Sequence, residues 1–154
     1  MQHIRSHRSR RRGGYTLLEV LIVVAIIALI AAMVVPNLLA RFQGAKITTT
    51  ETRIKSLDSM MKMYSIDYGT YPTGGTEVFE QLMNPGQHPR TGQTIPPYLE
   101  EYPRDGWDQP FNYEYPNSKF TGIDKPAIWS NGPNQQNDNG AGDDINNWAS
   151  ATQL

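Results

Sequence analysis

The fold of this chain is decided by Gly13-Gly14-Tyr15-Thr16-Leu17-Leu18-Glu19-Val20 and by the apolar run that continues to Val35. Two glycines and one carboxylate stand at the head of a run made of Val, Ile, Leu, Ala and Met. A secretory signal peptide places its small-residue cleavage site after the apolar region, whereas here the small residues come first. Cleavage at the glycines would therefore leave the apolar run on the mature chain.

Residues 1–14, which end inside this stretch, form a basic leader. Five arginines precede Gly13, and almost no apolar residue accompanies them. Positive charge before an apolar span keeps that side in the cytoplasm. Without these arginines the chain has nine basic and 15 acidic residues, a formal net charge of −6, which argues against nucleic acid as a partner. A nucleic-acid-binding arm is the weaker alternative, because the apolar run follows so directly.

Residues 15–36 are predicted to form a membrane-inserting helix. The stretch from Thr16 to Val35 would be about 30 Å long as an α-helix, just enough to cross a hydrocarbon core. Pro36 should end or kink this helix, because proline lacks the amide donor and clashes with the preceding turn.

Beyond Pro36 an apolar stripe with helical spacing continues to Tyr68, and its members are Ile47, Ile54, Leu57, Met61, Tyr64 and Tyr68. The pattern predicts one long helix from Thr16 to about Asp67, kinked at Pro36. Its second half should carry a globular head, residues 37–154. Its first half protrudes and has to be covered by lipid or by copies of itself.

The remainder of the chain predicts an α+β head. Residues 76–83 suit a short helix with Thr76 as its cap and with Val78, Phe79 and Leu82 pointing inward. Residues 111–115 and 127–129 suit short strands, and two or three such strands should lie across the apolar stripe of the long helix. The large aromatic residues are expected in the core: Trp107, Phe111, Tyr113 and Trp129.

The stretch from Ser130 to Trp148 is rich in Asn, Asp and Gly. Unbound, it should be mobile, because it buries little apolar surface. Four of its residues offer the hard oxygen ligands that calcium prefers: Asn134, Asp138, Asp143 and Asp144. It is not an EF-hand, because Gln135 stands where that motif has its first Asp. Composition leaves a solvated loop and a calcium site both open.

Together these motifs resemble a known family. Gly14-Tyr15-Thr16-Leu17-Leu18-Glu19-Val20, the apolar run and Pro36-Asn37-Leu38 resemble the class III signal of type IV pilins and of type II secretion pseudopilins. The head resembles that of the major pseudopilins at 67–73, 97–99, 103–110, 130–132 and 142–145. The resemblance implies a type IV pilin-like fold and a periplasmic filament subunit.

The resemblance also implies roles for individual residues. A prepilin peptidase would cut between Gly14 and Tyr15 and methylate the new amino group of Tyr15. Glu19 would pair with that amine on a neighbouring subunit. An unpaired carboxylate is costly inside a bundle of apolar helices, so such a pair would fix the axial register of the subunits. The alternative is that Glu19 sits at the headgroup edge of the span, where charge costs little.

The pseudopilin family has a calcium-dependent loop in the region that matches 130–145. Here Pro133-Asn134-Gln135 replaces the family's Ala-Asp-Gly, so a charged ligand becomes a neutral amide. Fewer carboxylates should lower the affinity for calcium, and hydrogen bonding could take the ion's place.

Catalysis is not expected. His3 and His7 lie in the leader and His88 lies alone in a Pro/Gly-rich loop, so no histidine has a cluster for base catalysis or zinc binding. The acidic pairs 100–101 and 143–144 are better explained as solvated surface than as a catalytic dyad.

The sequence therefore predicts a structural subunit of the periplasmic pseudopilus of a type II secretion system. It would be a single-pass inner-membrane protein with its C-terminal head in the periplasm, and would then polymerise with copies of itself to help export folded proteins. The resemblance implies a prepilin peptidase, minor pseudopilins and an inner-membrane assembly platform as partners.

Two alternatives remain at this stage. One is a type IV pilus subunit for adhesion or motility, which the absence of cysteine disfavours because many such pilins close a C-terminal loop with a disulfide. The other is a single-pass anchored binding protein, which would be monomeric and would keep its leader.

Overall fold

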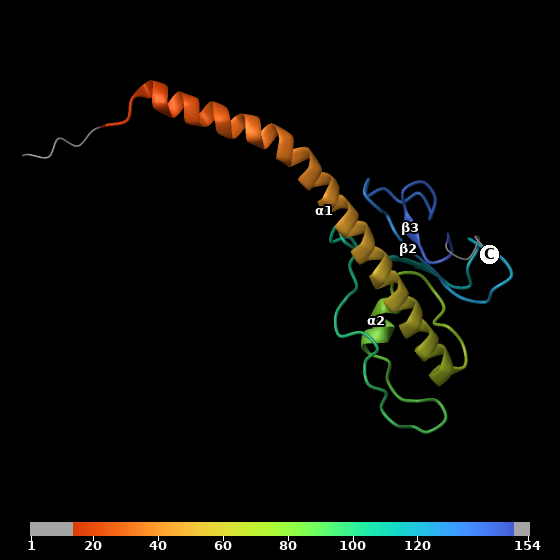
Figure 1. The fold of residues 1–154 in the computed structure, drawn as a ribbon. Helices are drawn as coiled ribbons and strands as arrows, with labels where there is room; N and C mark the ends of the chain where they lie inside the picture. Colours follow the sequence, from red (N-terminus) through yellow and green to blue (C-terminus); the bar gives the residue numbers. More distant parts are fainter. Residues whose placement is uncertain (1–13, 150–154) are drawn as a thin grey trace, which may run out of the picture. The chain divides into compact units, whose positions relative to one another are not determined.

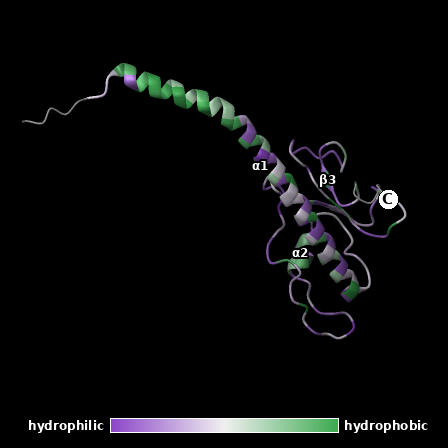
Figure 2. Ribbon diagram, viewed as in Figure 1, coloured by the Kyte–Doolittle hydropathy of each residue, from purple (hydrophilic) through white to green (hydrophobic). Residues whose placement is uncertain are grey.

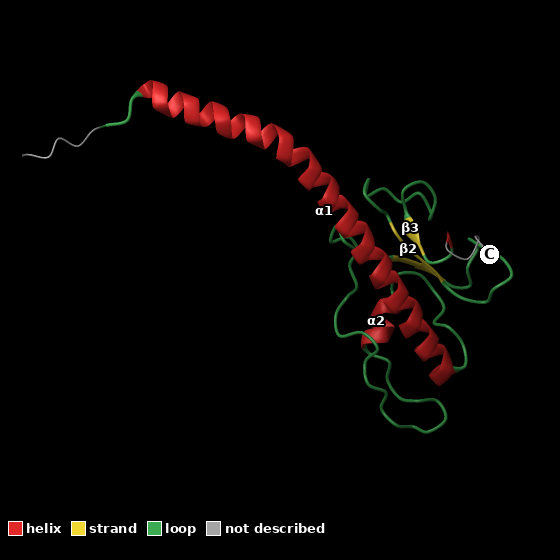
Figure 3. Ribbon diagram, viewed as in Figure 1, coloured by secondary structure: helices red, strands yellow, loops and turns green. Residues whose placement is uncertain are grey.

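The computed structural model describes residues 14–149 of the chain (Figure 1). Its elements are α1 (Leu17–Tyr68), α2 (Val78–Met83), β1 (Asn112–Glu114), β2 (Ala127–Ser130) and β3 (Ile145–Asn146). Most of the chain after α1 is loop (Figure 3). The chain divides into two compact units, residues 1–40 and 41–154, which are described in turn.

Helix α1 is a single α-helix of 52 residues, so the predicted long helix is confirmed, while the predicted kink at Pro36 stays a prediction. Pro36 lies inside it and does not end it. Proline has no amide proton, so the carbonyl of Ala32 loses its usual helical donor at this point. Gly69 follows the last helical residue with a φ of +83°, and its amide donates to the Ser65 carbonyl at 2.9 Å. A glycine that closes a helix in the left-handed region matches the expected ending.

In the first unit the helical side chains are exposed and, apart from Glu19 and Asn37, apolar, with Leu17 at 91% and Val35 at 48% exposure. Figure 2 shows this part of α1 as hydrophobic along most of its length. By length and composition, α1 is the one helix among residues 14–149 that could cross a membrane. A soluble chain seldom exposes so large an apolar surface, so this surface has to be shielded from water by lipid or by other protein chains.

In the second unit the apolar stripe on α1 forms one side of the hydrophobic core. Ile54, Leu57 and Met61 are at most 3% exposed, as predicted, whereas Ile47 at the beginning of the stripe is only half-buried. The residues that pack against the stripe come from α2, the sheet and the loops, and they include Val78, Phe79, Leu82, Leu99, Phe111, Tyr113 and Ile128. Trp107 and Trp129 are also buried, so the expected aromatic core is confirmed.

Helix α2 begins at Val78, two residues later than predicted. Thr76 is therefore not its cap. Glu77 occupies the cap position without a capping hydrogen bond, and its side chain instead accepts the Gly75 amide at 2.8 Å. The predicted inward face of this helix is confirmed, because Val78, Phe79 and Leu82 are fully buried.

The three strands form one antiparallel sheet in the order β1-β2-β3. Tyr113 lies opposite Ile128 in the first pair, and Ser130 lies opposite Ile145 in the second. The predicted strands at 111–115 and 127–129 are confirmed with slightly different ends. Strand β3 falls in the stretch predicted as a loop, because its two residues are too few to show an alternating pattern.

Candidate functional site

The start of α1 presents the predicted cleavage site to solvent. Tyr15 is 89% exposed, and no atom lies within 4 Å of the position where a Cβ of Gly14 would be. Both residues precede the first helical residue, Leu17. The Gly14–Tyr15 bond therefore lies outside the helix, in an exposed part of the chain.

Glu19 has a local partner that the sequence analysis did not assign. Its Oε2 accepts the amide of Thr16 at 2.8 Å and the Thr16 hydroxyl at 3.0 Å. In return the Glu19 amide donates to the Thr16 hydroxyl oxygen at 3.2 Å. This reciprocal arrangement is a capping box. The Thr-x-x-Glu spacing at residues 16–19 is the sequence signal that would have revealed it.

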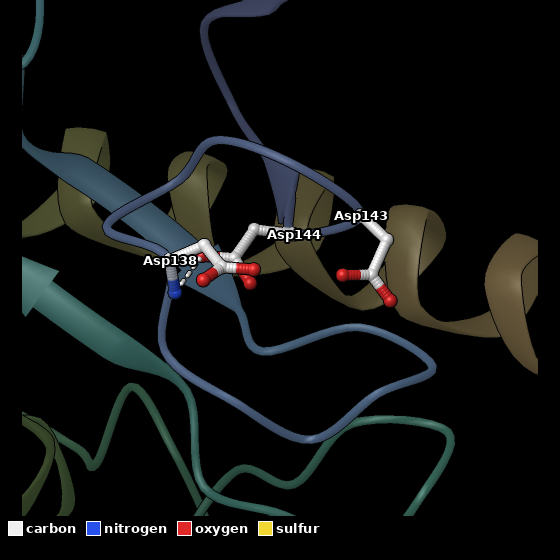
Figure 4. A group of neighbouring side chains, drawn as sticks. All are labelled: Asp138, Asp143 and Asp144. Carbon is white, nitrogen blue, oxygen red and sulfur yellow. Dashed lines mark hydrogen bonds between the residues drawn. The ribbon is translucent and has the colours of Figure 1, made fainter.

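The second candidate site is the loop between β2 and β3. Carboxylate oxygens of Asp138, Asp143 and Asp144 lie within 4.8 Å of one another, and this is the one such acidic or histidine group among residues 14–149. The amide of Asp138 donates to Asp144 Oδ2 at 3.1 Å, whereas the side chain of Asp143 points away from these two residues in Figure 4. Three of the four predicted ligands are thus brought together.

Asp144 is the most enclosed member of this group. Its Oδ2 also accepts the Gly140 amide at 2.7 Å, whereas its Oδ1 is buried and has no hydrogen-bond partner among the described residues. Burial raises the pKa of Asp144, helped by the charges of Asp138 and Asp143, while the two amide donors act in the opposite direction. A buried carboxylate oxygen without a donor is a group that a cation would satisfy.

Asn134 approaches the carboxylates with its nitrogen atoms. Its side-chain Nδ2 donates to Asp143 Oδ1 at 2.5 Å and to Asp138 Oδ2 at 3.3 Å, and its backbone amide donates to Asp143 Oδ2 at 2.9 Å. Its side-chain oxygen accepts the amide of Gln136. In this arrangement Asn134 is a donor to the acidic group, and it would have to turn its amide to act as a ligand.

Two glycines shape the loop because other chain segments touch them. A Cβ on Gly132 would lie 2.1 Å from the Asp143 carbonyl oxygen, and one on Gly140 would lie 2.2 Å from the Trp148 ring. Both glycines also have positive φ values. Any other residue at either position would push apart the two ends of the acidic loop.

Asn147 connects the end of the loop to the rest of the head, and no sequence pattern indicated this role. Its side chain donates to Asp58 on α1 at 2.7 Å and to the Pro126 carbonyl at 3.0 Å, and it accepts the Ile128 amide at 3.1 Å. One side chain thus joins the segment after β3 to α1 and β2.

Comparison with known families decides the class of the protein. The family model described as type II secretion system (T2SS), protein G matches residues 37–148, and the prokaryotic N-terminal methylation motif matches residues 9–35. The chain belongs to the type II secretion system protein G family. The predicted family and the pilin-like α+β fold are therefore confirmed.

Proteins of this family from several bacteria are similar to the chain over nearly its whole length. The type II secretion system core protein G of Vibrio cholerae is 33% identical over 141 residues, which cover 92% of this chain and 94% of that protein. Its Pseudomonas aeruginosa counterpart is 31% identical over 140 residues, covering 90% and 96%.

A solved structure supports the same fold. The crystal structure of the major pseudopilin from the type 2 secretion system of enterohaemorrhagic Escherichia coli superposes with a TM-score of 0.53 at 26% identity. The superposition covers 75% of this chain and 96% of the Escherichia coli chain.

Proposed function

We propose that this protein G family member is the major pseudopilin of a type II secretion system, a structural subunit and not an enzyme. The observation that carries the proposal is the pairing of two matches on one chain, the protein G head and the N-terminal methylation motif. The exposed Gly14–Tyr15 bond is compatible with processing by a prepilin peptidase. A type IV pilus subunit is disfavoured because the matched head family is that of type II secretion.

The apolar half of α1 would serve in two places. Before assembly it would hold the subunit in the inner membrane, with the head in the periplasm. In the filament the same surface would exchange lipid for the helices of neighbouring copies, at little cost because both surroundings are apolar. Minor pseudopilins and an inner-membrane assembly platform would be the further partners of this process.

Mass spectrometry of the mature N-terminus tests the processing. The expected result is a chain that begins at Tyr15 with a methylated amino group. An intact Met1 would contradict the proposal and point to an anchored monomer.

Deletion of the gene should abolish the export of folded enzymes and leave surface pili in place, whereas loss of pili with normal export would indicate a pilus subunit.

Calcium binding at the acidic loop is the second part of the proposal. Asp138, Asp143 and Asp144 would hold the ion, and Asn134 would join them with its side-chain oxygen after its amide turns. The residues fit a cation because Asp144 Oδ1 is buried and receives no hydrogen bond from residues 14–149. When bound, calcium would offset two of the three negative charges of the neighbouring carboxylates and hold the two ends of the loop together.

Thermal melting in calcium and in chelator tests this site. The melting temperature should be higher in calcium, by about 2–4 °C for each 1 kcal/mol that calcium binding adds to the free energy of unfolding. Asp144→Asn should remove most of the difference, whereas Glu101→Gln, a change on the exposed surface, should leave it intact. Equal melting temperatures of the unmodified chain in calcium and chelator would contradict the site.

A further inference from the structure

The chain contains two Asn-Gly dipeptides, at 131–132 and 139–140, in very different surroundings. In such a dipeptide the glycine amide nitrogen can attack the side-chain carbonyl carbon of the asparagine. Glycine favours this step because it has no side chain to obstruct the attack. We propose that Asn139-Gly140 is a site of spontaneous deamidation, promoted by Lys119 and Asp144.

Lys119 is placed to activate the carbonyl that would be attacked. Its Nζ donates to Asn139 Oδ1 at 3.2 Å. The ammonium group is held there by Glu114 Oε2 at 3.4 Å and by the ring of Trp129, whose centroid is 5.1 Å away. The Lys119 side chain is only 18% exposed. A fixed positive charge at this oxygen stabilises the negative charge that develops there during attack.

Asp144 is placed to assist the nucleophile. The Gly140 amide donates to Asp144 Oδ2 at 2.7 Å, so the proton that has to leave the nitrogen already points to a carboxylate. The new bond joins Gly140 N to the Asn139 side-chain carbon and closes a succinimide ring. The proton taken from Gly140 is returned to the departing amino group, which leaves as ammonia. Water then opens the ring to aspartate or isoaspartate.

The other dipeptide lacks both aids. Asn131 Oδ1 accepts from a neutral amide, Asn112 Nδ2, at 2.7 Å. The amide of Gly132 donates to the Ser130 hydroxyl at 3.1 Å instead of a carboxylate. Both glycines are closely packed against another segment, but Gly132 is buried whereas Gly140 is half-buried. Asn131 therefore serves as an internal control for the effect of the lysine and the carboxylate.

The modification would change the acidic loop. Either product adds a carboxylate beside Asp138 and Asp144. Isoaspartate also adds one carbon to the main chain, which moves Gly140 away from its hydrogen bond to Asp144 and from its contact with Trp148. The proposal depends neither on filament assembly nor on a bound cation.

Peptide mass spectrometry of the full-length protein, incubated in detergent and chelator at neutral pH, tests this site. We expect deamidation at Asn139 to be at least about tenfold faster than at Asn131, the effect of one charge-assisted hydrogen bond in the transition state. Lys119→Met should slow the reaction at Asn139 by about tenfold, Lys119→Arg should largely preserve it, and Lys62→Met on the exposed face of α1 should leave it unchanged.

Two results would overturn the proposal. Equal rates at Asn131 and Asn139 would show that the surroundings do not matter. An unchanged or faster rate at Asn139 in Lys119→Met would show that loop mobility, and not the lysine charge, controls the reaction. Because chelator is present throughout, neither result bears on calcium binding.

Discussion

Glu19 has one observed role, as a helix cap, and one proposed role, in filament assembly. In the present structure it caps its own helix through Thr16. Cleavage before Tyr15 would create a free amine one residue upstream of that cap. A neighbour's amine offers Glu19 a charge partner, and a carboxylate buried among apolar helices needs one. We therefore expect assembly to depend on the charge of Glu19 and not on the cap alone.

Glu19→Gln separates the two roles, because glutamine can still complete a capping box but carries no charge. We expect this variant to insert in the membrane at normal levels and to lose filament formation, measured by crosslinking between subunits. Thr16→Val, which removes the hydroxyl partner and keeps the charge, should cost about 1 kcal/mol of helix stability and retain assembly. Normal filaments from Glu19→Gln would contradict the pairing role.

At the scale of the element, α1 shows how the same helix changes its surroundings along its length. Near its start the side chains are apolar on all sides and exposed, whereas after Arg41 a single stripe is buried. Met61 and Met63 are two residues apart on this second part, yet Met61 is 0% exposed and Met63 is 57% exposed. The helical period accounts for the difference, because a step of two residues turns a side chain to another face.

This pair of methionines gives a matched test of the core. Met61→Ala should lower the free energy of unfolding of the head by about 2–5 kcal/mol, since it leaves a cavity between α1 and the sheet. Met63→Ala should change it by no more than about 0.5 kcal/mol. Chemical denaturation followed by circular dichroism measures both. Similar losses in the two variants would contradict the described packing.

At the scale of the whole head, the response to acid depends on carboxylates with shifted pKa values. A hydrogen bond from Ser118 lowers the pKa of Glu114, with a further contribution from Lys119. A carboxylate with a lowered pKa stabilises the fold above its ordinary pKa, 4.5 for Glu, and that contribution is lost as the pH falls through the lowered value. Asp144 acts in the opposite sense, because burial raises its pKa.

Glu114→Gln should therefore lower the melting temperature at pH 7 by about 1–3 °C, and the difference from the unmodified chain should shrink toward about pH 3. Glu101→Gln, which changes an exposed carboxylate, serves as the control and should have little effect at either pH. Melting curves at the two pH values measure the effect. A difference of the same size at both would contradict the assigned cause.

The buried Asp105 shows what local sequence patterns could not reveal. Its Oδ1 accepts the amides of Trp107 and Gln109, and its Oδ2 accepts the Ser130 hydroxyl. The neighbouring Gly106 is required because a Cβ there would lie 2.5 Å from the Lys46 carbonyl oxygen on α1. Ser130 is 25 residues from Asp105, and Lys46 is 60 residues from Gly106, so no periodicity or spacing could identify these two contacts.

The sequence by itself determined the long helix, its apolar half, the stripe under the head, the two longer strands and the cleavage motif. These features depend on side chains of one kind that follow one another or recur at a helical or strand spacing. Such a pattern can be recognised in the sequence without knowing which residues it contacts. Only the tertiary structure decided the third strand, the start of α2, the donor role of Asn134 and the contacts of Lys119 and Asn147. The start of α2 depends on a local hydrogen bond between Glu77 and Gly75, and the others depend on hydrogen bonds between residues that folding brings together.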